Sequence, residues 1–147
     1  MNVTAFLSPS NVALDVRARD KLAALRELSG RAAAALNLSA HEVAHEIECR
    51  EKLGSTGIGG GASMPHARFR EVKTPFGFLA RLRQPINFDA IDGQPVDVVF
   101  LLLLPASSQL DQLNTLAAVA RKLRDPHIMG KIRGASTAAE LYTAVAA

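Results

Sequence analysis

A segment rich in glycine and hydroxyl side chains leads to one histidine, His66, and its composition suits a phosphoryl group held on imidazole. Residues 54–68 read Gly-Ser-Thr-Gly-Ile-Gly-Gly-Gly-Ala-Ser-Met-Pro-His-Ala-Arg. Glycines can adopt positive φ and bring bare N–H groups close to anionic oxygens, and hydroxyl groups offer further donors. Pro65 restricts the residue before it to extended geometry, so His66 is expected in a stiff segment. The candidate phosphate-binding residues here are Ser55, Thr56, Gly59, Gly60 and Gly61.

Nucleotide-binding motifs do not account for this segment. A Walker A loop closes on Gly-Lys-Ser/Thr, whereas Gly61-Ala62-Ser63 contains no lysine. A dinucleotide fingerprint places its glycines after a strand and before a helix, and here the order is expected to be helix, glycines, strand. The remaining alternative to a phosphohistidine site is a flexible turn with an incidental histidine.

His41-Glu42-Val43-Ala44-His45 matches the H-E-x-x-H pattern of zinc peptidases. Glu42, however, lies three residues after Ser39, which is the spacing of a capping box at the start of a helix. No third metal ligand stands at a recognisable spacing downstream. We therefore interpret the two histidines as part of an exposed helix face and predict no metal.

Composition and charge narrow the class of protein. The 147 residues, 48% apolar and 21% charged, predict one domain spanning residues 1–147. The net charge of +3 is spread among carboxylates, and with one tyrosine and no tryptophan the chain lacks stacking platforms, so no nucleic-acid binding is expected. The longest apolar run, Val98 to Leu104, is too short to span a bilayer, so no membrane insertion is expected. The lone Cys49 and the absence of a signal pattern at the N-terminus favour a cytoplasmic location.

Helix and strand patterns alternate along the chain. Helical spacing and capping signals predict helices over Lys21–Leu36, from Ser39 to about Leu53, from Ser107 or Ser108 to Asp125-Pro126, and from Thr137 to the C-terminus. Strands are expected around Ala62–His66, Phe76–Arg83 and Asp97–Leu104, the last one buried on both faces. These patterns predict an α/β fold in which helices cover both faces of a small sheet.

Three long motifs resemble one known family. Arg50-Glu51-Lys52-Leu53-Gly54-Ser55-Thr56-Gly57-Ile58-Gly59 continues through Met64-Pro65-His66, followed by residues 88–97 and the helical stretch 113–123. Together they resemble the IIA proteins of the bacterial phosphotransferase system (PTS), of the mannitol/fructose type and specifically the nitrogen-regulatory enzyme IIA. The resemblance covers nearly the whole chain, and it implies a mixed sheet of about five strands flanked by helices on both faces.

The resemblance also implies a function. His66 would be the phosphorylated residue, carrying the group on Nε2 as tele-phosphohistidine. The phosphoryl group would come from an HPr-type (NPr-like) carrier protein, itself charged by an enzyme I that uses phosphoenolpyruvate, with no nucleotide, metal or other cofactor. The protein would be a phosphocarrier that binds regulatory target proteins according to its phosphorylation state. Whether such a phosphotransfer protein counts as an enzyme, and in which oligomeric state it works, the sequence leaves open.

Several further site residues follow from the resemblance. Arg50 matches the family's arginine near the active histidine, and its guanidinium suits phosphoryl oxygens. Gln112 stands where many members carry a second histidine; it can donate to phosphoryl oxygen but cannot become cationic. Because the carrier must reach His66, apolar contact residues are also expected around it, with core packing as the alternative for each: Ile58, Met64 and Phe69.

Two other functions stay open at this stage. The chain could be the IIA component of a fructose/mannitol-type transport system that passes phosphate to a IIB partner. It could also be an interaction module whose phosphorelay is weakened, as the glutamine at position 112 makes conceivable. The absence of attached IIB or IIC segments favours the regulatory interpretation.

Overall fold

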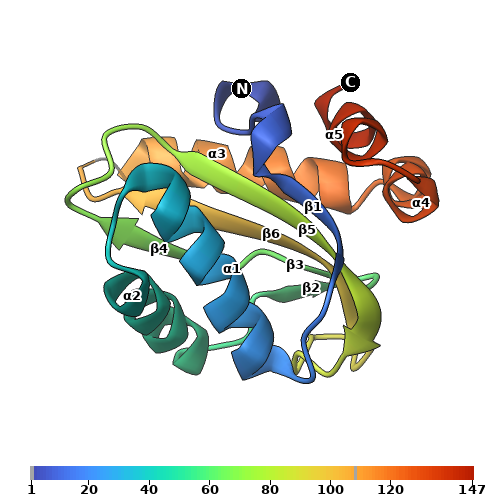
Figure 1. The fold of residues 1–147 in the computed structure, drawn as a ribbon, viewed down its shortest axis with the longest axis horizontal. Helices are drawn as coiled ribbons and strands as arrows, with labels where there is room; N and C mark the ends of the chain where they lie inside the picture. Colours follow the sequence, from blue (N-terminus) through green and yellow to red (C-terminus); the bar gives the residue numbers. More distant parts are fainter. Residues whose placement is uncertain (1, 108) are drawn as a thin grey trace.

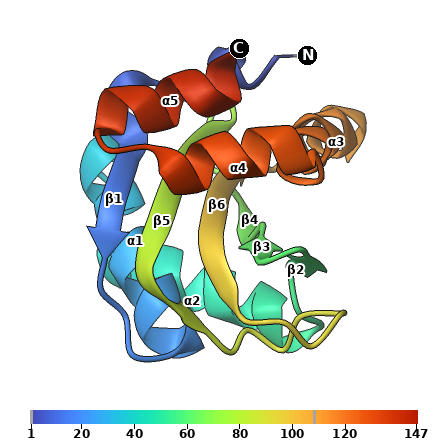
Figure 2. The same cartoon turned by 90° about the vertical axis from the view of Figure 1, so that its right-hand side faces the viewer.

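In a computed structural model that describes residues 2–107 and 109–147, the chain forms a six-stranded sheet between two layers of helices (Figures 1 and 2). The strands are β1 (Val12–Val16), β2 (Gly57–Gly59), β3 (Ala62–Ser63), β4 (His66–Phe69), β5 (Phe76–Ile86) and β6 (Val96–Pro105). The helices are α1 (Lys21–Leu36), α2 (Ala40–Lys52), α3 (Gln109–Leu123), α4 (Pro126–Gly134) and α5 (Ala138–Ala146), with short 3₁₀ turns at Val3–Ala5 and Pro9–Asn11.

The sheet is mixed, as the family resemblance implies. Its strand order is β1-β5-β6-β3-β2, and β4 also pairs with β6. The β1/β5, β3/β6 and β4/β6 pairs are parallel, whereas β5/β6 and β2/β3 are antiparallel. Figure 1 shows α1 and α2 over one face of this sheet, and Figure 2 shows α4 and α5 in front of the other. Helices on both faces confirm the predicted α/β layering.

Two apolar cores lie on either side of β6, because successive side chains of a strand point to opposite faces. One set packs with α3, α4 and α5 and consists of Val98, Phe100, Leu102 and Leu104. The other packs with α1 and α2 and consists of Val99, Leu101 and Leu103. All seven side chains are at most 1% exposed. This is the reason that the β6 sequence is continuously apolar and not alternating.

Side chains cap the first turn of three helices, and two of these caps, Ser39 and Thr137, were predicted from the sequence. Asp20 accepts a hydrogen bond from Ala23 N at 2.9 Å at the start of α1, and Asn37, at φ 57°, ends that helix. Ser39 Oγ accepts from Glu42 N at 3.3 Å, and Thr137 Oγ1 accepts from Glu140 N at 3.1 Å.

Across residues 2–107 and 109–147, no helix combines the length and apolarity needed to cross a bilayer.

Other elements differ from the sequence-based expectation. β1 and β2 were not predicted, and the strand expected over Ala62–His66 is two strands, β3 and β4, separated at Met64-Pro65. Asp125-Pro126 does end α3, but Asp125 also caps a further helix, α4, by accepting from His127 N at 2.9 Å. Of the two serines expected to cap α3, Ser108 lies outside the described residues.

Candidate functional site

His66 is the first residue of β4, and hydrogen bonds fix the backbone before it. β3 and β4 pair in turn with β6, and Met64-Pro65 joins them. Pro65 has no N–H, but its oxygen accepts from Leu102 N at 2.9 Å. Met64 N donates to Thr56 O at 3.0 Å. The imidazole is therefore presented from a backbone held by the sheet on one side and by the Thr56 segment on the other.

The ring orientation identifies which nitrogen is available for chemistry. His66 Nδ1 lies 2.8 Å from the main-chain oxygen of Met64. Because a carbonyl oxygen can only accept, Nδ1 carries the hydrogen and Nε2 carries the lone pair. The ring is half-buried, and within the described part of the chain no hydrogen bond engages Nε2. The sequence could not name this acceptor, because it is a main-chain atom two residues away.

The surroundings of His66 favour its neutral form. Burial lowers the pKa of the imidazole below 6.5, and the positive charge of Arg50 lowers it further. The Met64 carbonyl and the carboxylate of Glu51 act in the opposite direction, but the net change in pKa is downward. At neutral pH the ring is therefore an uncharged nucleophile with its lone pair on Nε2.

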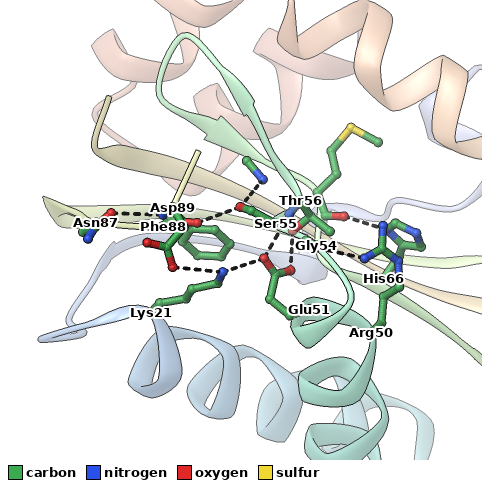
Figure 3. Close-up of polar contacts among 12 residues, drawn as sticks. Lys21, Arg50, Glu51, Gly54, Ser55, Thr56, His66, Asn87, Phe88 and Asp89 are labelled. Atoms are coloured by element: carbon green, nitrogen blue, oxygen red, sulfur yellow. Dashed lines mark hydrogen bonds and ion pairs between the residues drawn. The ribbon is translucent and has the colours of Figure 1, made fainter. Parts of the chain in front are cut away.

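Two predicted residues lie beside His66. Arg50, from the last turn of α2, and Gln112, from the first turn of α3, line the same surface depression as the imidazole. Arg50 Nη1 donates to Gly54 O at 3.0 Å (Figure 3), and no described carboxylate forms an ion pair with it. Gln112 Nε2 donates to Pro105 O at 3.1 Å, which uses one of its two amide hydrogens. A guanidinium and an amide thus line the same depression as the imidazole.

The two predicted hydroxyl donors are engaged inside the protein. Thr56 is buried, and its Oγ1 donates to Glu51 Oε1 at 2.6 Å. Ser55 Oγ donates to the main-chain oxygen of Phe88 at 2.7 Å (Figure 3). Both hydroxyl hydrogens therefore hold the segment before His66 in place, and their direct contact with a phosphoryl group stays a prediction.

The three consecutive glycines lie at the turn between β2 and β3, with φ of 96°, 66° and 82° at Gly59, Gly60 and Gly61. Gly60 N donates to Asp92 Oδ2 at 3.0 Å, so a carboxylate of the protein already occupies this amide. Gly60 O accepts from Arg133 Nη2 at 2.8 Å. Gly59 and Gly60 line a depression against α4, not the one that contains His66. The structure does not bring these glycines to the imidazole.

The expected contact residues are largely core residues. Met64 is 6% exposed and Phe69 is 7% exposed, one in each apolar core. Ile58 is half-buried against the core on the α4 side. For Met64 and Phe69 this burial fits the alternative of core packing and leaves little surface for a partner. The exposed apolar side chains that line the depression around His66 are Leu53, at 85%, and Leu113, at 64%. The sequence analysis named neither leucine as a contact residue.

His41 and His45 are exposed on α2, as the helix-face interpretation predicts. His45 Nε2 lies 3.6 Å from Cys49 Sγ one turn later. Among the described residues, no three His, Cys, Asp or Glu side chains gather closely enough to hold a metal ion.

Comparison with known proteins identifies the family. Residues 5–147 match the family described as "Phosphoenolpyruvate-dependent sugar phosphotransferase system, EIIA 2". The chain therefore belongs to this family of PTS IIA proteins. It is 38% identical over 146 residues to a nitrogen regulatory protein of Bradyrhizobium diazoefficiens, covering 99% of this chain and 95% of that one. It is 43% identical over 128 residues to a nitrogen regulatory protein of Escherichia coli, covering 86% and 78%.

A solved structure agrees with this relationship. The nitrogen regulatory protein IIA-Ntr from Neisseria meningitidis superposes with a TM-score of 0.91 at 33% identity, covering 97% of this chain and 98% of that one. Within the PTS IIA family, the protein is thus of the nitrogen-regulatory type.

Proposed function

We propose that the protein accepts a phosphoryl group on Nε2 of His66 from an HPr-type carrier and regulates target proteins according to its phosphorylation state. One observation carries the proposal. The Nδ1–H of His66 is held by Met64 O at 2.8 Å, which leaves the lone pair on Nε2, and the ring lines one depression together with Arg50 and Gln112.

The transfer balances without a cofactor. The lone pair of Nε2 attacks phosphorus, a new P–N bond forms, and the P–N bond to the carrier's histidine breaks, returning its electron pair to the donor ring. His66 keeps its Nδ1 hydrogen against Met64 O, so the phosphorylated ring carries positive charge that this carbonyl stabilises. A cationic ring is a good leaving group, which suits a group that is to be passed on again.

The protein's contribution is placement and charge. Phosphoryl transfer spreads charge over three equatorial oxygens, and catalysis rests on alignment and electrostatic stabilisation. Arg50 offers a guanidinium that no described carboxylate neutralises, and Gln112 has a second amide hydrogen left. The first turn of α3 lines the same depression, so its partial positive charge adds to theirs.

The proposal is tested by incubating the protein with labelled phosphoenolpyruvate, enzyme I and the HPr-type carrier. We expect an acid-labile, base-stable label on the wild-type protein and none on the His66→Ala variant, with His41→Ala as the matched control that keeps the label. A label retained by His66→Ala would place the site elsewhere and reject the proposal.

The regulatory role is separated from sugar transport by the next recipient. We favour regulation because the relatives at 38% and 43% identity are both nitrogen regulatory proteins. Phospho-His66 protein is mixed with IIB domains of the fructose and mannitol type and loss of label is followed. Transfer to a IIB domain at rates comparable to charging would support the transport component instead. Retention of label, together with target binding that changes on phosphorylation, would support regulation.

A further inference from the structure

The buried carboxylate of Glu51 accepts hydrogen bonds from three donor groups. Glu51 follows Arg50 in α2 and is 7% exposed. Its Oε2 accepts from Thr56 N at 2.9 Å and from Lys21 Nζ at 2.8 Å, and its Oε1 accepts from Thr56 Oγ1 at 2.6 Å. Figure 3 shows the carboxylate between the lysine and the threonine. A buried charge persists only when it is paired and hydrogen-bonded, and here both conditions are met.

Lys21 joins this cluster to a second loop. It is the first residue of α1, and its Nζ lies 3.8 Å from Asp89 Oδ2 and 4.9 Å from the centre of the Phe88 ring. The Phe88 oxygen also accepts from Ser55 (Figure 3). The cluster thus ties together the start of α1, the end of α2, the 54–56 segment and the 87–89 loop.

A continuous set of hydrogen bonds leads from Glu51 to the reactive ring. Glu51 holds both the amide and the hydroxyl of Thr56. Thr56 O accepts from Met64 N at 3.0 Å, and Met64 O accepts from His66 Nδ1 at 2.8 Å. The group that decides which ring nitrogen keeps the hydrogen is therefore placed by a segment that Glu51 anchors.

We propose that Glu51 is a positioning residue for phosphoryl acceptance: by fixing Thr56 it fixes the Met64 carbonyl, which holds His66 in the tautomer with a free Nε2. The inference rests on the proposed function of His66, since it assigns a role in that reaction. Loosening the anchor lets the carbonyl move and the ring sample the other tautomer or turn away, which lowers the fraction ready for in-line attack. The carrier-binding surface is left as it is.

A purely structural role is the competing explanation, and the chain offers a matched control for it. Glu48, one turn earlier on α2, also joins α2 to α1, through Arg26 at 3.4 Å. No hydrogen bond connects Glu48 to Thr56 or Met64 among the described residues. Glu51→Gln and Glu48→Gln therefore both weaken an α1–α2 ion pair, and only the first disturbs the path to His66.

A second variant separates positioning from folding. Thr56→Val keeps the size of the side chain and the bond from Thr56 N to Glu51, and it removes only the hydroxyl donor. If Glu51→Gln does not fold, Thr56→Val decides the question.

Two measurements on these variants test the inference. Long-range ¹H–¹⁵N NMR of the histidine rings, at a pH well above 6.5, reports the tautomer of His66 directly. Single-turnover transfer from the phosphorylated carrier, over a range of carrier concentrations, separates the maximal rate from half-saturation. We expect Glu51→Gln and Thr56→Val to show a mixed tautomer and a maximal rate lowered about tenfold with unchanged half-saturation, and Glu48→Gln to match the wild type.

A folded Glu51→Gln or Thr56→Val with the wild-type tautomer and maximal rate would overturn the inference. A wild-type protein that accepts no phosphate would instead reject the proposed function, and the tautomer comparison would still decide whether Glu51 positions the ring.

Discussion

Arg50 lies in the same depression as His66, and its guanidinium is anchored to the main-chain oxygen of Gly54, 3.0 Å away, with no carboxylate partner among the described residues. An ion pair would neutralise the arginine, whereas a carbonyl holds it in place and leaves its charge. The residue directly after it, Glu51, is turned inward and paired with Lys21. Two successive residues of α2 thus have different surroundings. Arg50 lines the depression that contains His66, whereas Glu51 is buried and holds Lys21 and Thr56.

Replacing Arg50 tests this difference. In Arg50→Gln we expect the rate of phosphoryl acceptance to fall about tenfold or more, because one charged donor to the transferring group is lost. The pKa of His66 should rise, since the charge of Arg50 lowers it. Rapid-quench transfer and NMR titration of the ring measure the two effects. Arg68→Gln is the control, because Arg68 is an exposed arginine that lines the same depression. Equal effects of both substitutions would contradict a specific role of Arg50.

The lowered pKa of His66 predicts a pH dependence of stability. The unfolded ring titrates near 6.5 and the folded ring below it, so between these two values the unfolded state binds more protons. The free energy of unfolding should therefore fall as the pH drops below 6.5 and level off once the folded ring is protonated too. Denaturant titrations of the wild type and His66→Ala across this range isolate the contribution. An identical pH slope for the two proteins would exclude it.

The same shift predicts the pH profile of the reaction. Because Nε2 must be unprotonated to attack, the rate of acceptance should decline as the pH falls, with a midpoint below 6.5. The profile is measured by quenched-flow transfer from the previously phosphorylated carrier, in buffers of different pH and equal ionic strength. A decline centred at or above 6.5 would show that the ring is not held neutral as described.

Alanine substitutions in the turn of consecutive glycines should lower the stability by different amounts. Gly60 and Gly61 both have positive φ, which costs an alanine about 1–2 kcal/mol. A Cβ on Gly60 would meet nothing within 4 Å, whereas one on Gly61 would clash with Arg133 Nη2 and lie 2.9 Å from Asp97 Oδ1. Gly61→Ala also forces Arg133 from its 2.8 Å pairing with Asp97, so it should destabilise by about 1 kcal/mol more than Gly60→Ala. Urea unfolding compares them, and equal losses would contradict the crowding argument.

Surface apolar side chains beside His66 predict where the carrier docks. Leu113 is 64% exposed and lines the depression, so Leu113→Glu should raise the half-saturation concentration for the carrier and leave the maximal rate nearly unchanged. Ile91 is 86% exposed and does not line the depression, which makes Ile91→Glu the matched control. A Leu113→Glu variant with the same half-saturation concentration as Ile91→Glu and the wild type would contradict docking of the carrier at this surface.

Local signals made much of the fold predictable. Lys21–Leu36 forms a helix over the residues that the spacing predicts, and Ser39 and Thr137 cap helices as their sequence context indicates. β1 and α4 were missed for different reasons. β1 gains its stability from pairing with β5, a partner more than sixty residues away. α4 is short and begins at the same Asp125-Pro126 pair that ends the helix before it.

The sequence predicted the candidate site's histidine, arginine and glutamine, but it did not predict the contacts that hold the neighbouring backbone in place. His66, Arg50 and Gln112 meet in one depression, as the family resemblance implies. The glycines were predicted to hold phosphate from composition, but their amides are placed by tertiary contacts, and Asp92 of a distant loop binds Gly60 N. Glu51 escaped notice because a glutamate on a helix is usually exposed, and only the fold brings Lys21 and Thr56 to it.

The most direct test of the central claim is a long-range ¹H–¹⁵N NMR spectrum of the protein after phosphorylation by phosphoenolpyruvate, enzyme I and the carrier. We predict that the ¹⁵N signal coupled to phosphorus is Nε2 of His66 and that Nδ1 still carries its hydrogen. Phosphorus on Nδ1, on another residue, or on none would contradict the account.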